Sequence, residues 1–223
     1  MDWSLLAAAL SFWSSATNTM NLRFGMMTPT VLDTAALFGL SPLGVEVNAA
    51  LIAPEAEWSF KAAWPTVAKL AGAKAKNMLN YSSFYNHFSV EDSAEDDSIA
   101  PLGEVEHTAF LLYWLCKFVF CTQANKVTSE FAHLPDYLAQ GGRLALGLFF
   151  LGHIYRTHGM KSKHGGSLWA FLLWLQAYFP ELRGVATIAD IEPLANAFAR
   201  SPRKHNTTAF YFKFFYDLTE RTG

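Results

Sequence analysis

Residues 107–159 read HTAFLLYWLCKFVFCTQANKVTSEFAHLPDYLAQGGRLALGLFFLGHIYRTHG, and this stretch decides the fold. It holds two apolar segments, Ala109–Cys121 with a single charge at Lys117 and Leu144–Tyr155 with none. A helix that crosses a bilayer needs about 20 apolar residues, so shorter segments are typical of helices buried in a globular core. Both segments are rich in Leu and Phe and lack the alternation of a half-buried strand. We therefore predict two buried helices.

The sequence between and after these segments predicts further helices with defined ends. Pro135 favours the start of a short helix, and the Gly141-Gly142 pair favours its end. A third apolar segment, Leu168–Phe179, has the same character as the first two. We expect one core built from all three segments, in a mainly α chain that forms a single helical domain over residues 1–223.

A small β-hairpin is expected near the N-terminus. Apolar residues alternate weakly along Thr19–Phe24, Gly25 interrupts the pattern, and Met26–Thr28 can form the second strand. Thr30 then has the position of a helix N-cap, with Asp33 three residues later as in a capping box. This pair predicts a helix that begins directly after Thr30.

A helix-turn-helix-like element is predicted after this capping signal. Val31–Phe38 forms its first helix, Gly39 the left-handed end of that helix, and Pro42–Leu51 the second helix. A recognition helix needs side chains that reach base edges or phosphates. Pro42–Leu51 has no Lys or Arg and carries Glu46, so we expect a structural element rather than a reader of DNA.

Charge is distributed unevenly, although the chain has 17 Lys and Arg against 19 Asp and Glu. The acidic run at 89–100 lies in a segment, 77–116, that has no Lys or Arg, and we expect it to be a mobile loop. Residues 117–223 have an excess of basic residues. Two basic turns in this part are candidate contacts for nucleic acid or a partner: Arg156, Lys161, Lys163, Arg200, Arg203 and Lys204.

The second group of candidate site residues is aromatic. Phe210–Tyr216 reads FYFKFFY, in a chain with 19 Phe and only 16% charged residues, against about 25% in typical domains. As a helix this segment has aromatic rings on every side, and only Lys213 and Asp217 are polar. Such a helix is either buried or part of an interface. The candidate partner-binding aromatics are Phe210, Phe212 and Phe215.

The residue patterns of common catalytic and metal sites are absent from the sequence. It has no HExxH, P-loop, GxGxxG or GxSxG pattern. The two cysteines, Cys116 and Cys121, have neither metal nor redox spacing, and we expect two buried side chains in a reducing compartment. Lys117 has the most apolar setting of the lysines, but no phosphate-binding loop for pyridoxal phosphate precedes it. We therefore predict no enzyme, no metal and no cofactor.

Four segments of the chain resemble the plant mobile domain, a family also labelled aminotransferase-like. They are FLLYWLCKFVF followed by the Lys-Val pair at 126–127, ALGLFFLGHIYR at 145–156, LRFGMMTPTVLDTAALFGL at 22–40, and GSLWAFLLWLQAYFPEL at 166–182. The resemblance implies a nuclear protein of transposon origin, involved in transposon silencing, genome stability and meristem maintenance. It also implies a protein partner, a phosphatase of the plant PP7-like type.

Two non-enzymatic functions follow from the residues and the resemblance together. The aromatic excess and the low charge favour a protein-interaction module, which is our main hypothesis. Nucleic-acid binding through the two basic turns is the alternative. A pyridoxal-phosphate aminotransferase, which the family label implies, is disfavoured by the missing phosphate-binding loop. We expect no membrane association, because no apolar segment has the length of a span.

Overall fold

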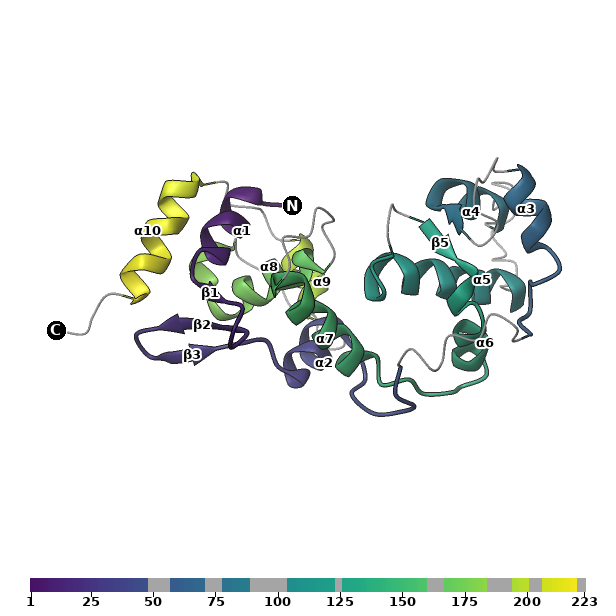
Figure 1. The fold of residues 1–223 in the computed structure, drawn as a ribbon, viewed down its shortest axis with the longest axis horizontal. Helices are drawn as coiled ribbons and strands as arrows, with labels where there is room; N and C mark the ends of the chain where they lie inside the picture. The colour runs from purple at the N-terminus through teal and green to yellow at the C-terminus, as the bar shows by residue number, and fades with distance from the viewer. Residues whose placement is uncertain are drawn as a thin grey trace. The chain divides into compact units, whose positions relative to one another are not determined.

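A computed structural model of the chain describes residues 1–47, 57–70, 78–88, 104–122, 126–159, 167–183, 194–200 and 206–219. The fold is mainly α-helical, with small antiparallel sheets (Figure 1). The chain divides into two compact units, of which unit 1 joins Met1–Pro42 to Ala145–Gly223 and unit 2 is Leu43–Leu144. The predicted acidic loop at 89–100 lies outside the described residues.

The three apolar segments are divided between the two compact units. Segment 109–121 belongs to unit 2, whereas 168–179 and nearly all of 144–155 belong to unit 1. An apolar pattern predicts that a helix is buried but not which helix covers it. The prediction of a single domain over residues 1–223 stays a prediction, because two compact units can unfold together or separately.

Unit 1 contains most of the described helices and the larger of the two sheets. Its elements are α1 (Trp3–Leu10), β1 (Trp13–Ser14), β2 (Thr19–Leu22), β3 (Gly25–Met27), α2 (Val31–Phe38), α7 (Leu146–Gly159), α8 (Leu168–Tyr178), a 3-10 turn (Pro180–Leu182), α9 (Leu194–Arg200) and α10 (Thr208–Thr219). Both ends of the chain contribute to this unit, which makes its contacts strongly non-local.

The predicted hairpin is confirmed as part of a three-stranded antiparallel sheet in the order β1-β2-β3. Met20 lies opposite Met27, and Leu22 lies opposite Gly25. Gly25 has a φ of 128°, which an L side chain rarely adopts, so a glycine suits this end of the hairpin. The two-residue strand β1 was not predicted, because so short a strand carries no alternating pattern.

The predicted capping box at the start of α2 is confirmed. The Thr30 hydroxyl accepts a hydrogen bond from the Asp33 amide at 3.3 Å, and the Asp33 carboxylate accepts one from the Thr30 amide at 2.6 Å. Gly39 ends the helix in the left-handed conformation, with a φ of 67°. Both signals act within one helical turn, which is why the sequence alone predicts them.

The second helix of the predicted helix-turn-helix-like element does not form over residues 42–47. A helical residue donates its amide to the carbonyl four residues earlier. The Val45 amide instead donates to the Arg143 carbonyl at 2.8 Å, and Val45 forms a parallel bridge with Leu144. Gly44, with a φ of 130°, lies against Arg143 so closely that a Cβ would be 2.4 Å from the carbonyl oxygen. Residues 48–51 lie outside the described residues.

Unit 2 is a smaller helical unit with a two-stranded sheet. Its elements are α3 (Trp64–Leu70), β4 (Met78–Asn80), α4 (Tyr81–Phe88), α5 (Glu104–Trp114), a π-helical turn (Leu115–Val119), β5 (Lys126–Thr128), a 3-10 turn (Ser129–Phe131) and α6 (His133–Ala139). The predicted short helix with a Gly-Gly end is confirmed, since α6 is followed by Gly141 with a φ of 84°.

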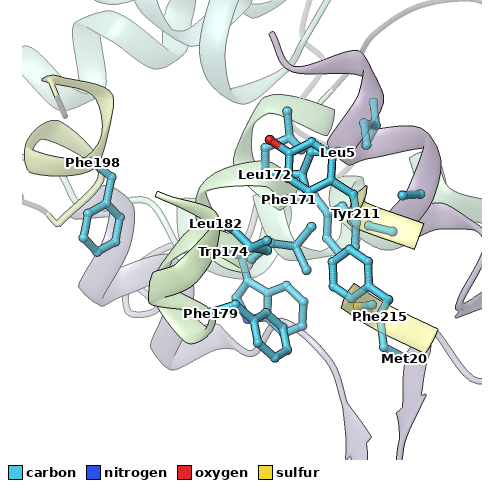
Figure 2. Packing of buried hydrophobic residues seen from close by; sticks show 14 of the residues in the cluster. Leu5, Met20, Phe171, Leu172, Trp174, Phe179, Leu182, Phe198, Tyr211 and Phe215 are labelled. Atoms are coloured by element: carbon cyan, nitrogen blue, oxygen red, sulfur yellow. The ribbon is translucent and has the colours of Figure 1, made fainter. Parts of the chain in front are cut away.

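The core of unit 1 is centred on α8, which is apolar all round as the sequence predicted. The largest fully buried side chains of this helix are Phe171 and Trp174, and Figure 2 shows them with residues from α1, β2 and α10. Burying a large apolar side chain contributes roughly 1.5–3 kcal/mol. Ser167 occupies the N-cap position of α8, but its buried hydroxyl has no hydrogen-bond partner among the described residues.

A glycine allows α7 to pack closely against the end of α2. The Gly147 amide donates to the Ser41 carbonyl at 2.9 Å. A Cβ at Gly147 would lie 2.8 Å from the Leu40 carbonyl oxygen and 2.9 Å from the Thr34 hydroxyl. Gly152 on the same helix is exposed, and a Cβ there would meet nothing within 4 Å.

The two glycines therefore form a matched pair for testing this helix contact. We expect Gly147→Ala to lower the free energy of unfolding by roughly 1–3 kcal/mol, because the added methyl group displaces backbone. Gly152→Ala should raise it by up to about 1 kcal/mol, because alanine favours the helix. Urea unfolding of both variants measures the difference. Equal stabilisation by both changes would show that α2 and α7 do not approach this closely.

Candidate protein-interaction surface

The aromatic segment near the C-terminus forms α10, and its residues divide between two faces. Thr207 starts the helix, since its hydroxyl accepts a hydrogen bond from the Phe210 amide at 3.2 Å. One turn later the Lys213 ammonium donates to the Asp217 carboxylate at 3.0 Å, a four-residue spacing that favours a helix. In Figure 1, α10 lies alongside α1 at the edge of unit 1.

The inner face of α10 is part of the core of unit 1. Tyr211 and Phe215 are both fully buried. The Phe215 ring lies 5.9 Å from the ring of Phe12 and 5.9 Å from that of Phe179, measured between centroids. Phe215 was named as a candidate partner-binding aromatic, and in this structure no part of its side chain reaches the surface.

A partly buried hydrogen bond joins the inner face of α10 to the start of α1. The Tyr211 hydroxyl donates to one carboxylate oxygen of Asp2 at 2.9 Å, and the other oxygen accepts from the Leu5 amide at 3.0 Å. Burial, and then this hydrogen bond, raises the pKa of Tyr211 above its usual value. Asp2 thus caps α1 and holds α10 with the same side chain.

The outer face of α10 exposes aromatic rings to solvent. We define this face as Ala209, Phe210, Phe212, Lys213, Tyr216 and Asp217. The exposed fractions are 48% for Phe210, 46% for Phe212 and 42% for Tyr216. The rings of Phe212 and Tyr216 are nearly parallel, with centroids 6.4 Å apart, and Phe12 lies 5.1 Å from Phe212. Of the three predicted aromatics, the structure therefore places Phe210 and Phe212 on the surface.

Sequence reasoning missed three residues that shape this site, namely Asp2, Phe12 and Tyr216. Tyr216 follows Phe212 by four residues, so the helical period could have identified it as a neighbour on one face. Asp2 and Phe12 lie about 200 residues from α10, and no local signal connects them to it.

The basic residues are not brought together in the part of the chain that the structure describes. Arg156 is exposed on α7. Arg200 ends α9, and its side chain is not described. The remaining four, Lys161, Lys163, Arg203 and Lys204, lie outside the described residues. Nucleic-acid binding through these turns stays a prediction.

In unit 2, Lys117 is the lysine that was considered for pyridoxal phosphate, and Cys116 is a cysteine that could act as a nucleophile. The Lys117 ammonium is exposed and donates to the Tyr113 hydroxyl at 2.7 Å. Burial raises the pKa of the Cys116 thiol to about 12, which keeps it protonated and unreactive. Cys121 is only partly buried and has a φ of 47°, so the expectation of two buried cysteines is correct for Cys116 alone.

Within the ranges that the structure describes, no group of three or more His, Cys, Asp or Glu side chains is arranged to hold a metal ion. Over the same ranges, none of the helices combines the length and the apolar character that crossing a bilayer requires.

Comparison with known proteins finds one matching family and two similar plant proteins. The sequence model of a family described as "Plant mobile domain" matches residues 1–221. Protein MAIN-LIKE 1 of Arabidopsis thaliana is 29% identical over 162 residues, which cover 71% of this chain and 31% of that protein. Protein MAINTENANCE OF MERISTEMS of the same plant is 27% identical over 168 residues, which cover 74% and 34%. The chain spans about a third of the length of these curated relatives. No solved structure matches.

The two faces of α10 predict effects of very different size for the same substitution on stability. Phe215→Ala should lower the free energy of unfolding by roughly 3–5 kcal/mol, because it leaves a cavity in the core. Phe212→Ala should change it by less than about 1 kcal/mol, since nearly half of the ring is already in water. Denaturant unfolding in dilute solution measures both. A loss at Phe212 as large as that at Phe215 would show that the outer face is buried within the chain.

Proposed function

Because the chain belongs to the plant mobile domain family, we propose that it is a non-enzymatic protein-interaction module that works in the nucleus. Both relatives are plant proteins, and the name of one refers to the maintenance of meristems. By family resemblance we extend this to a role in transposon silencing, genome stability and meristem maintenance.

One observation supports the interaction module above all others. A single helix directs Tyr211 and Phe215 into the core and leaves Phe212 and Tyr216 on the surface, next to a Lys-Asp pair. Aromatic side chains surrounded by charged groups are the usual composition of a protein interface, and aromatic residues often dominate the binding energy. A helix presents such side chains to a groove on a partner at four-residue spacing. The outer face of α10 has this spacing and composition.

We propose a phosphatase of the plant PP7-like type as the protein partner, as the family resemblance implies. The outer face of α10 is then its contact surface. Its rings would enter an apolar groove on the phosphatase, while Lys213 and Asp217 would stay at the rim, where ion pairs set orientation more than affinity.

Calorimetric titration of a purified plant PP7-like phosphatase with the full chain tests this proposal. Phe212→Ser and Tyr216→Ser should each weaken binding by about 30-fold, which corresponds to roughly 2 kcal/mol for a central aromatic contact. The thermal stability of the chain should change little.

The matched control is Leu32→Ser on α2, which removes another side chain exposed in unit 1, 74% accessible to solvent. This control should bind the phosphatase with unchanged affinity. If the two α10 variants also bind with unchanged affinity, the outer face of α10 is not the contact surface. If the wild-type chain does not bind the phosphatase, that partner is excluded.

A further inference from the structure

The exposed side chains of α10 are arranged in two parallel rows. An α-helix turns about 100° per residue, so Ala209, Phe212 and Tyr216 fall within about 60° of one another. They form an apolar row whose members are all exposed. Lys213 and Asp217 form a charged row along one side of it. Phe210 lies beyond the charged row, away from the apolar one.

The charged row is complementary to itself when one copy is reversed. The Lys213 side chain is 76% exposed and the Asp217 side chain 57%, so both groups remain available to a second chain. If two α10 helices meet antiparallel along their apolar rows, a two-fold axis places each charged row beside the other. Lys213 then faces Asp217 of the second copy at both ends of the contact. A parallel two-fold pair would place the two charged rows on opposite sides of the contact, where Lys213 and Asp217 of one copy do not meet those of the other.

We propose that the outer face of α10 pairs antiparallel with the same face of a second copy of this chain. The inference rests on the proposed function, because it uses the same surface, the outer face of α10. It adds that a second copy of the chain covers this face when no other partner is present. Cyclic two-fold pairs are the commonest protein oligomers, and each contact in them occurs twice. Phe212 and Tyr216 of both copies leave water together.

The size of the contact makes this a weak and reversible dimer. A helix of 12 residues is about 18 Å long, so the buried surface is at the small end of specific interfaces. Exposed ion pairs add little affinity, but only the antiparallel orientation brings the two charged rows together, so the ion pairs favour that orientation. A weak pairing of this kind covers the aromatic rings and can still be displaced by a stronger partner.

Sedimentation equilibrium of the full chain over a concentration range tests the pairing. The wild-type mass should rise from monomer towards dimer at concentrations on the order of 100 µM. Lys213→Asp gives the charged row two acids, and Asp217→Lys gives it two bases. Each variant alone should remain monomeric at the concentration where the wild type dimerises, with an unchanged circular dichroism spectrum.

An equimolar mixture of these two variants should dimerise again, because the two acids of the Lys213→Asp variant then face the two bases of the Asp217→Lys variant. The ion pair within one helix cannot produce this recovery, since both variants have lost it. The double variant Lys213→Asp/Asp217→Lys should also dimerise with itself. Phe212→Ser should be monomeric, whereas Phe210→Ser should dimerise as the wild type does.

The outcomes separate this inference from the proposed function. A wild-type chain that stays monomeric, or a mixture of the two charge variants that stays monomeric, overturns the antiparallel pairing. If phosphatase binding still depends on Phe212 in that case, the proposed function stands without the dimer. A dimer that follows the charge pattern while no phosphatase binds supports the pairing and removes the phosphatase as partner.

Discussion

The contact between α1 and α10 is the interaction on which the rest of unit 1 depends. It joins the two ends of the chain, since Asp2 and Tyr211 are 209 residues apart and share a hydrogen bond of 2.9 Å. The rings of Phe12 and Phe215 pack against each other and extend this contact beyond the hydrogen bond. Without α10, the buried side of α1 and the rings of α8 would be exposed where α10 now covers them. Closing so long a loop is costly in entropy, and the buried aromatic surface offsets that cost.

The same contact determines which surface remains for a partner. A helix with aromatic residues on every side can bury only the part that a neighbour covers. Because Tyr211 and Phe215 lie against the core, Phe212 and Tyr216 must lie towards solvent, one position further round the helix. The rigidity of the inner face holds the outer rings in place before binding, which lowers the entropy that an interface loses. The stability of unit 1 and the recognition that we propose therefore depend on one helix.

Local signals in the sequence were sufficient for much of the fold. The Thr30–Asp33 capping box, the Gly39 helix end and the hairpin at Gly25 each act within a few residues, and all three are confirmed. The apolar segments were correctly predicted to be helices. Their distribution over two compact units could not be predicted, because periodicity does not identify a packing partner.

The failures share one physical cause, which is a contact made at long range. Val45 bonds to Arg143 instead of continuing a helix. β4 pairs with β5 across more than 40 residues of sequence, although neither strand has a pattern of its own. Phe215 was named as a candidate partner-binding aromatic because no residue near it in the sequence indicates that it packs against Phe12 and Phe179. The sequence thus indicated the candidate helix, while the division of its residues between two faces required the structure.

Native-state hydrogen exchange of the full chain tests the central claim most directly, namely that α10 is an integral part of the core of unit 1. The account predicts that the slowest amides of α1, α8 and α10 exchange with the same free energy of opening, because none of these helices can open without the others. If the amides of α10 exchange through a separate opening of much lower free energy while those of α8 stay protected, α10 is a detachable helix and the account is wrong.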